Sequence, residues 1–328
     1  MHAGPSIAVS KRAAGNALVV PPRPRRLRPI VLFLPLIAAV AIGGCSVRSI
    51  AIHELSAALS EGAGVYATDN DPELVRAALP FALKLTEALL EENPHDRGLL
   101  TSAASGFTQF SFAFVEQDAD RIEARDLEQA TRLRRRAVGL YLRARDYGLR
   151  GLDTAHPGFA AQLRSDAIAA VARCRRGDVP LLYWTAASWA AAIALSKDQP
   201  EQYADQPLVE AMIDRALLLD EAFDRGAIHT LLISYEMARP GQSATAAPRA
   251  RAHFARAVEL SRHRAAGPLV ALAETVAVAL QDRAEFESLL KQAIEINVDD
   301  EPETRLVNLI MQERARWLLT RTDDLFVD

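Results

Sequence analysis

Among the side chains of this 328-residue chain that could act as bases, nucleophiles or metal ligands are seven histidines and two cysteines. Cys174 lies between Arg173 and Arg175, and these cations would lower the pKa of its thiol if the thiol were exposed. A free cysteine on a helix is more often a buried, inert residue. We therefore expect Cys174 to be a buried helical thiol.

The histidines are spread along the chain in patterns that do not indicate a reactive site. His229 lies in an apolar segment between Ile228 and Leu231, where a lone histidine is more often a satisfied core residue than a base or a ligand. His253 and His263 are ten residues apart, so they do not share a helix face in ligand spacing.

Sequence motifs for catalysis are also missing. The sequence contains no Gly-x-Ser-x-Gly, no phosphate-binding glycine loop, no Cys-x-x-Cys and no His-Glu-x-x-His. No nucleophile, base and orienting group can be assembled from its residues. We predict a protein that is not an enzyme and that binds no cofactor and no metal.

The elements that would position any of these side chains are helices. From Ser49 onward, apolar residues recur at spacings of three and four, whereas alternating strand-like runs are nearly absent. Asp71-Pro72-Glu73 can begin one helix, with Asp as its cap and Pro at its first position. The apolar stripe expected to face the core of this helix is Leu74, Ala77, Ala78, Phe81, Leu85, Ala88 and Leu89.

Parts of this helical pattern repeat. Residues 88–98 can be aligned with residues 216–226, with Asp-Arg-Gly in common, and the helix endings at Ala257 and Ala293 are 36 residues apart. That distance is close to the period of about 34 residues of tetratricopeptide repeats. The sequence thus predicts an all-α, tetratricopeptide-like array of about ten to twelve antiparallel helices, with an irregular helical bundle as the alternative.

The other cysteine indicates where the protein is sent. Cys45 follows Gly43 and Gly44 at the end of a fifteen-residue apolar run that begins at Ile30, after a basic leader. This run is shorter than the roughly 20 residues of a membrane-spanning helix. We expect residues 1–44 to be a lipoprotein signal peptide and Cys45 to be the site of lipid attachment, in preference to a secreted or single-span protein. Ser46 favours the outer membrane.

The expected mature chain, residues 45–328, is acidic. Removal of the leader takes away six of 38 basic residues and none of the 42 acidic ones, which leaves a net charge of −10. Nucleic acid and anionic lipid surfaces would be repelled by such a chain, so we expect neither as a partner. With Cys45 acylated, no disulfide can form, and stability must come from the helical core.

Phenylalanines are concentrated in one short segment. Phe107, Phe110 and Phe114 share a helix face, Phe112 points elsewhere, and Gln109 interrupts the apolar run. An aromatic stripe at helical spacing usually fills a helix–helix interface. The alternative is that Phe112 and its neighbours line a concave surface or a tunnel for an apolar ligand.

Tyr183, Trp184 and Trp189 present the same choice. We expect Trp189 to be buried, whereas Tyr183 or Trp184 could face a cavity because each carries a polar group that needs a partner.

An arginine-rich stretch comes next to an acidic one. Its members are Arg132, Arg134, Arg135, Arg136, Arg143, Arg145 and Arg150. The default interpretation is a solvated helix face supported by pairs such as Glu128 with Arg132. In an acidic protein, the same cluster is also the natural place to receive an acidic partner or an organic-acid ligand, because guanidinium groups match carboxylates.

Three segments together resemble a known family. Residues 105–115, 179–190 and 226–236 are similar to the T component (TatT) family associated with TRAP transporters, and the resemblance extends from about Ile50 to about Ala315. The segments are features of the fold and form no catalytic motif. They are specific in combination and weak singly.

The resemblance implies a periplasmic lipoprotein of tetratricopeptide-like helices. It implies a homo-oligomer around a central opening, such as a trimer, which docks an extracytoplasmic solute-binding protein of a TRAP system. From this resemblance together with the aromatic and arginine clusters, we expect the protein to hold an apolar or organic-acid ligand in a central tunnel. A scaffold lipoprotein for envelope assembly without a ligand is the alternative. The candidate contact residues are Phe107, Gln109, Phe110, Phe112, Phe114, Tyr183 and Trp184.

Overall fold

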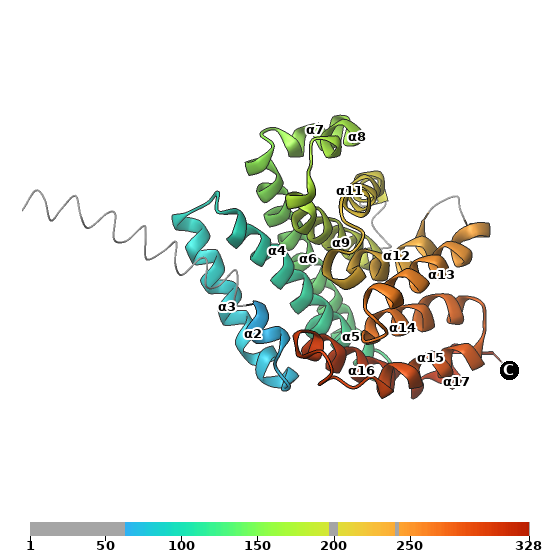
Figure 1. Ribbon diagram of the computed structural model, residues 1–328. Helices are drawn as coiled ribbons and strands as arrows, with labels where there is room; N and C mark the ends of the chain where they lie inside the picture. Colours follow the sequence, from blue (N-terminus) through green and yellow to red (C-terminus); the bar gives the residue numbers. More distant parts are fainter. Residues whose placement is uncertain (1–62, 197–202, 240–242, 328) are drawn as a thin grey trace, which may run out of the picture. The chain divides into compact units, whose positions relative to one another are not determined.

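The computed structural model describes residues 63–196, 203–239 and 243–327, all within a compact unit of residues 51–328. The predicted signal peptide and Cys45 lie outside the described residues. The described residues contain no strand, which confirms the predicted all-α class (Figure 1). None of the described helices is both long enough and apolar enough to cross a bilayer.

Eleven described helices have at least seven residues, in agreement with the predicted number. They are α3 (Pro72–Glu92), α4 (Arg97–Ser111), α6 (Leu127–Ala155), α7 (Phe159–Ser165), α9 (Val179–Leu195), α11 (Gln206–Leu219), α12 (Ala227–Ala238), α13 (Ser243–Leu260), α14 (Ala266–Leu272), α15 (Arg283–Glu295) and α16 (Arg305–Leu319). The shorter α-helices are α2 (Ala63–Ala67), α5 (Gln117–Ile122), α8 (Ala167–Ala172) and α17 (Thr322–Leu325). Two π-helical segments, η2 (Phe112–Glu116) and η5 (Ala273–Ala277), follow α4 and α14 directly.

Helices that are consecutive in the chain pack on one another. Helix α4 contacts α3, α6 and α9, and the series continues with α9 on α11, α12 on α13, and α15 on both α14 and α16. The last long helix, α16, also contacts α2 and α3, so the array closes on its own beginning. Arg305 of α16 supports this closure by donating a hydrogen bond to the carbonyl oxygen of Thr68 at 2.8 Å.

Local sequence signals explain where several helices begin. The carboxylate of Asp71 accepts hydrogen bonds from the backbone N–H groups of Glu73 and Leu74, and Pro72 is the first helical residue, as predicted. Asp126 and Asp282 cap α6 and α15 in the same way. Each of these side chains satisfies a backbone donor that the helix cannot satisfy itself.

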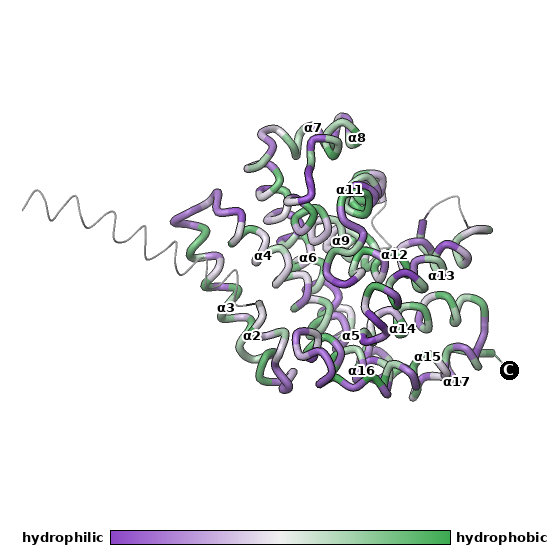
Figure 2. Tube along the Cα trace, in the orientation of Figure 1, coloured by the Kyte–Doolittle hydropathy of each residue, from purple (hydrophilic) through white to green (hydrophobic). Residues whose placement is uncertain are grey.

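The predicted core stripe of α3 holds at Leu85 and Leu89, which pack in the core, but it is wrong at the exposed positions Leu74, Ala77, Phe81 and Ala88. Leu74 and Phe81 expose 58% and 75% of their surface, and the buried face carries Val75, Leu83 and Leu90 instead. Hydrophobic residues alternate with hydrophilic ones along the length of α3 (Figure 2). They fall both on the face with Val75, Leu83 and Leu90 and on the face with Leu74 and Phe81. Only the packing against α4 decides which face enters the core.

Three of the four alanines at the repeated helix endings are buried, as expected for small residues at a helix–helix contact. Ala216, Ala257 and Ala293 are fully buried, whereas Ala88 is exposed. The alignment places Ala88 on Ala216, but α3 ends at the C-cap Asn93 and α11 at the C-cap Asp220, one aligned position earlier. A shift of one residue turns a helical side chain by about 100°, which carries Ala88 to the surface.

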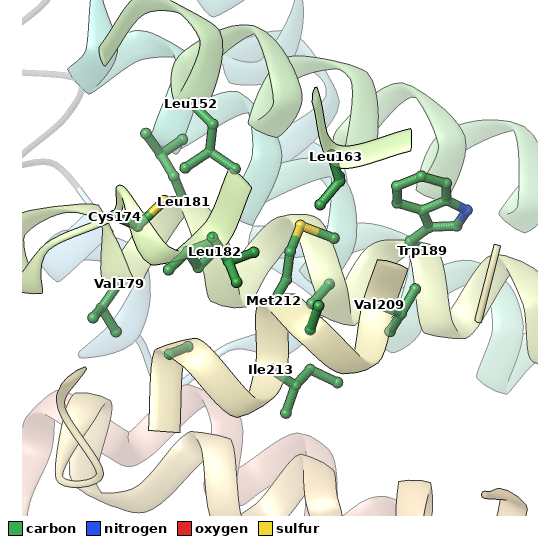
Figure 3. Close-up of a cluster of buried hydrophobic side chains, with 14 of the residues drawn as sticks. Leu152, Leu163, Cys174, Val179, Leu181, Leu182, Trp189, Val209, Met212 and Ile213 are labelled. Atoms are coloured by element: carbon green, nitrogen blue, oxygen red, sulfur yellow. The ribbon is translucent and has the colours of Figure 1, made fainter. Parts of the chain in front are cut away.

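The largest described core cluster lies where α6, α9 and α11 meet. Figure 3 shows its side chains, among them Leu152 of α6, Leu182 of α9 and Met212 of α11. Trp189 is 1% exposed, which confirms the expected burial. Helices α6 and α9 approach closely at Gly148, where a Cβ atom would lie 2.0 Å from the Thr185 Oγ1.

Replacing Gly148 with Ala should therefore destabilise the protein by about 1–3 kcal/mol, because the methyl group must displace Thr185 from its hydrogen bond to the Leu181 carbonyl. Gly139→Ala on the same helix is the matched control, since a Cβ atom there meets nothing within 4 Å. The control should stabilise by about 0.5–1 kcal/mol through helix propensity. Thermal melting of both variants tests this, and equal effects would contradict the close approach.

Candidate functional site

A basic and aromatic groove lies along α6, opposite the end of α3. It consists of two adjoining hollows with volumes of about 390 and 370 Å³, which share Arg143, Tyr147 and Arg150 of α6. The first is completed by Lys84, Glu87, Leu90, Glu91 and Pro94, and the second by Gly139, Leu142 and Asp146. We call this the α3–α6 groove. The two helices that form the groove, α3 and α6, both pack on α4 (Figure 1).

Stacked rings hold the two arginines of the groove. The Tyr147 ring stacks on Phe107 of α4, with centroids 6.0 Å apart and planes at 14°. The Arg143 guanidinium lies 5.3 Å from the Phe107 centroid, and that of Arg150 lies 5.4 Å from the Tyr147 centroid. Cation–π contacts of this kind orient a guanidinium without using its N–H donors. The remaining donors can therefore point at a ligand.

The carboxylate of Glu87 is paired with other side chains of the groove. Its carboxylate accepts hydrogen bonds from Lys84 at 2.6 Å and from the Tyr147 hydroxyl at 2.8 Å, and Arg143 lies 3.5 Å away. Burial raises the pKa of Glu87, but these bonds and the charge of Arg143 outweigh it, and the net pKa is lowered. Burial and the bond to Glu87 raise the pKa of Tyr147 to about 12. Tyr147 therefore remains a neutral hydrogen-bond donor at physiological pH.

Arg150 has fewer internal partners than most arginines of the predicted cluster. It donates one hydrogen bond to the Pro94 carbonyl at 3.1 Å. By contrast, Arg132 pairs with Glu128, Arg134 with Asp120 and Glu123, and Arg145 with Asp146. Over its two hollows the groove has three cations, Lys84, Arg143 and Arg150, and three carboxylates, Glu87, Glu91 and Asp146. Lys84 and Arg143 pair with Glu87, so among the described residues Arg150 is the groove cation without a carboxylate partner. Such an arrangement suits an anion with carboxylate groups.

The predicted phenylalanine contacts are distributed over core and surface. Phe107, Phe110 and Phe114 are buried in the core cluster of α3, α4 and α6, where the rings of Phe110 and Phe114 lie 5.8 Å apart. Gln109 is exposed, and Phe112 is 37% exposed at the start of the π-helical segment η2. The ring of Phe107 contacts two groove residues, because it stacks on Tyr147 and lies under the Arg143 guanidinium.

Tyr183 and Trp184 lie away from the groove, on α9. Their rings meet edge to face at 4.8 Å, and Tyr183 also packs against Phe223 at 5.3 Å. Burial, followed by the charge of Asp224, raises the pKa of Tyr183. Both side chains are half-buried. Neither lines the two hollows of the groove.

His229 is buried, as expected, but it is not alone. Its Nδ1 lies 2.8 Å from the Nδ1 of His253, so one imidazole donates a hydrogen bond to the other. The Nε2 of His229 lies 3.5 Å from a Glu221 oxygen. Sequence spacing missed this pair because the histidines are on different helices, α12 and α13. Burial is the largest cause that lowers the pKa of both histidines.

The histidine pair should make stability depend on pH. Unfolded histidines take up protons below about pH 6.5, whereas the folded pair resists them, so stability should fall as the pH drops from about 7.5 to 5.5. His253→Asn should flatten this fall. His95→Gln, at an exposed position, should not.

Glu116 acts in the opposite direction over part of this range. Its pKa is raised to about 7, mainly by burial, and it therefore adds stability as the pH falls. The measurement is the difference in melting temperature between each variant and the parent at each pH. Glu116 is present in all three proteins, so its effect cancels in this difference. A difference for His253→Asn that does not change with pH would contradict the assignment.

Comparison with known proteins gives one family. The model of the TRAP transporter T-component family matches residues 68–326. A protein of Treponema pallidum (strain Nichols), described as uncharacterized, is 30% identical over 306 residues, which cover 87% of this chain and 94% of that protein. The family match includes α3, α4 and α6, which carry the groove, and the array that closes through α16. The chain belongs to the TRAP transporter T-component family.

Proposed function

We propose that this protein is a lipid-anchored, periplasmic accessory component of a TRAP-type transport system. In this role it docks an extracytoplasmic solute-binding protein and holds an organic acid in the α3–α6 groove. The single observation that carries the proposal is the family match over residues 68–326, which includes nearly all described helices. A transport component of this kind has no need of catalysis.

The lining of the α3–α6 groove supports an organic acid as the ligand of this protein. Arg143 and Arg150 stack on Phe107 and Tyr147, and both line a hollow of about 390 Å³. A hollow of that volume is in the range of small-molecule sites. An apolar ligand is less well supported, because Phe107, Phe110 and Phe114 are buried among other side chains.

The exposed apolar face of α3 supports the proposed docking of a solute-binding protein. Leu74 and Phe81 are on α3 and expose more than half of their surface. Exposed large apolar side chains grouped on one face mark protein contacts more often than isolated ones do. We assign this face to the solute-binding protein. Self-association, for which the family resemblance suggests a trimer, would then use another surface.

Membrane attachment through Cys45, with the outer membrane preferred, remains part of the proposal. Cys45 lies outside the described residues, so its support is the sequence Gly43-Gly44-Cys45 after the apolar run. A scaffold lipoprotein for envelope assembly, without any ligand, is the alternative.

Capture of the cognate TRAP solute-binding protein by the full chain tests the proposal. Association should be specific, with a solute-binding protein of an unrelated transporter class as the negative control. Phe81→Glu should weaken association about 30-fold, the effect of losing a central apolar contact worth about 2 kcal/mol. Ile168→Glu is the matched control, because Ile168 of α8 is similarly exposed, at 71%.

Two outcomes would count against the proposal in different ways. Failure of the wild-type chain to capture the binding protein would favour the scaffold alternative. If Phe81→Glu captures normally but becomes monomeric in light scattering, the α3 face belongs to self-association and the docking assignment is wrong.

A further inference from the structure

Three chemically different metal-ligand groups converge at one end of α6. They are the imidazole of His156, the thiol of Cys174 and the carboxylate of Asp178, and one ligand atom from each lies within 4.8 Å of the other two. His156 is the C-cap of α6, Cys174 lies in the loop after α8, and Asp178 ends the short 3-10 helix η3 (Arg176–Asp178). The expected helical position of Cys174 is therefore wrong, although its burial is confirmed. We propose that this cluster is a binding site for a single zinc ion.

The donor set fits zinc. Zn²⁺ takes thiolate, imidazole and carboxylate ligands in a tetrahedron, and three protein ligands leave the fourth position for water. In such a site the donor atoms are about 3.3–3.7 Å apart. The His156 Nε2 and Asp178 Oδ2 are already 2.9 Å apart. All three ligand atoms lie within 4.8 Å of one another, so they are within about 1.5 Å of the separations that a tetrahedral zinc ion requires.

Neighbouring groups already hold the ligands in place. The Arg97 guanidinium bonds the Asp178 Oδ1 at 2.6 Å, and the backbone N–H of Arg175 bonds Oδ2 at 2.8 Å. Arg215 donates to the carbonyl oxygen of Cys174 at 2.6 Å, which fixes the loop that carries the thiol. The ring of Phe159 lies 6.4 Å from that of His156. Contacts of this type orient metal ligands in known sites.

Charge and access are also compatible with a divalent ion. Cys174 is completely buried and Asp178 nearly so, whereas the His156 side chain is 16% exposed and provides the way in (Figure 3 shows Cys174 within the core cluster). On binding, the Cys174 thiol loses its proton to solvent, and the imidazole ligates through an unprotonated nitrogen. The thiolate and the carboxylate supply two negative charges against the two positive charges of the ion, and with the Arg97 guanidinium the site then carries one net positive charge. Arg97 remains on the other carboxylate oxygen.

Cobalt substitution tests the site directly. The full chain with Cys45→Ser, so that Cys174 is the sole thiol, is freed of metal with a chelator and titrated with Co²⁺ and then with Zn²⁺. One Co²⁺ per chain should bind with a thiolate-to-cobalt charge-transfer band and the strong d–d bands of a tetrahedral ion. Zinc should displace it and raise the melting temperature.

Two variants and one control assign the ligands. Cys174→Ser should remove the charge-transfer band, and His156→Gln should weaken Co²⁺ binding about tenfold or more. His95→Gln, at an exposed position in the turn before α4, should change neither. If Cys174→Ser does not fold, as judged by circular dichroism, His156→Gln at its partly exposed position still provides the decisive comparison.

The proposal is overturned if cobalt binds without a charge-transfer band, or if His156→Gln binds as tightly as the parent. The three side chains would then serve only as a hydrogen-bonded link that holds the α7–α8 segment on α6.

Discussion

The buried guanidinium of Arg314 joins the last long helix of the array, α16, to α5 in its first half and to η5. It lies in α16, with an exposed fraction of 7%, and bonds Asp120 of α5 at 3.1 Å and Glu274 of η5. Asp120 is 194 residues away in sequence. An unpaired buried charge costs several kcal/mol, so Arg314 stabilises the fold only when both carboxylates are in place. The interaction therefore requires the closed array and, once formed, maintains it.

Both π-helical segments lie beside this ion-pair network. Glu274 is part of η5, and η2 ends at Glu116, which accepts a hydrogen bond of 2.5 Å from the Tyr141 hydroxyl. Arg134 extends the network from Asp120 to Glu123. An inserted π turn shifts the residues that follow it around the helix axis, and π segments are frequent at functional positions. Here the two π-helical segments lie next to the acidic side chains that meet the buried Arg314.

The network also fixes the helix that carries the groove. Tyr141 and Arg134 are on α6, so their bonds to Glu116 and Asp120 set the position of α6 against η2 and α5. Further along the same helix, Arg143, Tyr147 and Arg150 meet the end of α3. Since α16 also contacts α3, both walls of the groove depend on the closure of the array.

Local signals in the sequence predicted the local structure well. The Asp71-Pro72 cap, the helical periodicity and the burial of Trp189 follow from residues close together in the chain. The two apolar faces of α3 could not be ranked, because the choice depends on contacts with another helix.

Contacts between distant segments were beyond such reasoning. The pair of His229 and His253, the cluster around Cys174 and the partners of Arg314 all join different helices or loops. The sequence shows the arginine-rich stretch. It does not show which of these arginines pair within the protein and which line the groove, because that depends on where α3 lies. The described structure brings Phe107 to the groove and leaves Tyr183 and Trp184 elsewhere.

If the closed helical array presents Arg143 and Arg150 to an organic acid, the protein should bind succinate in a calorimetric titration. Succinate carries two carboxylates and so can engage both arginines. The account predicts one site per chain and a loss of about tenfold or more in affinity for Arg143→Gln, since a charge-assisted hydrogen bond is worth about 1.5–3 kcal/mol. Arg132→Gln on the same helix, outside the groove, should bind as the parent does. Absence of succinate binding, or an equal loss in both variants, would contradict the account.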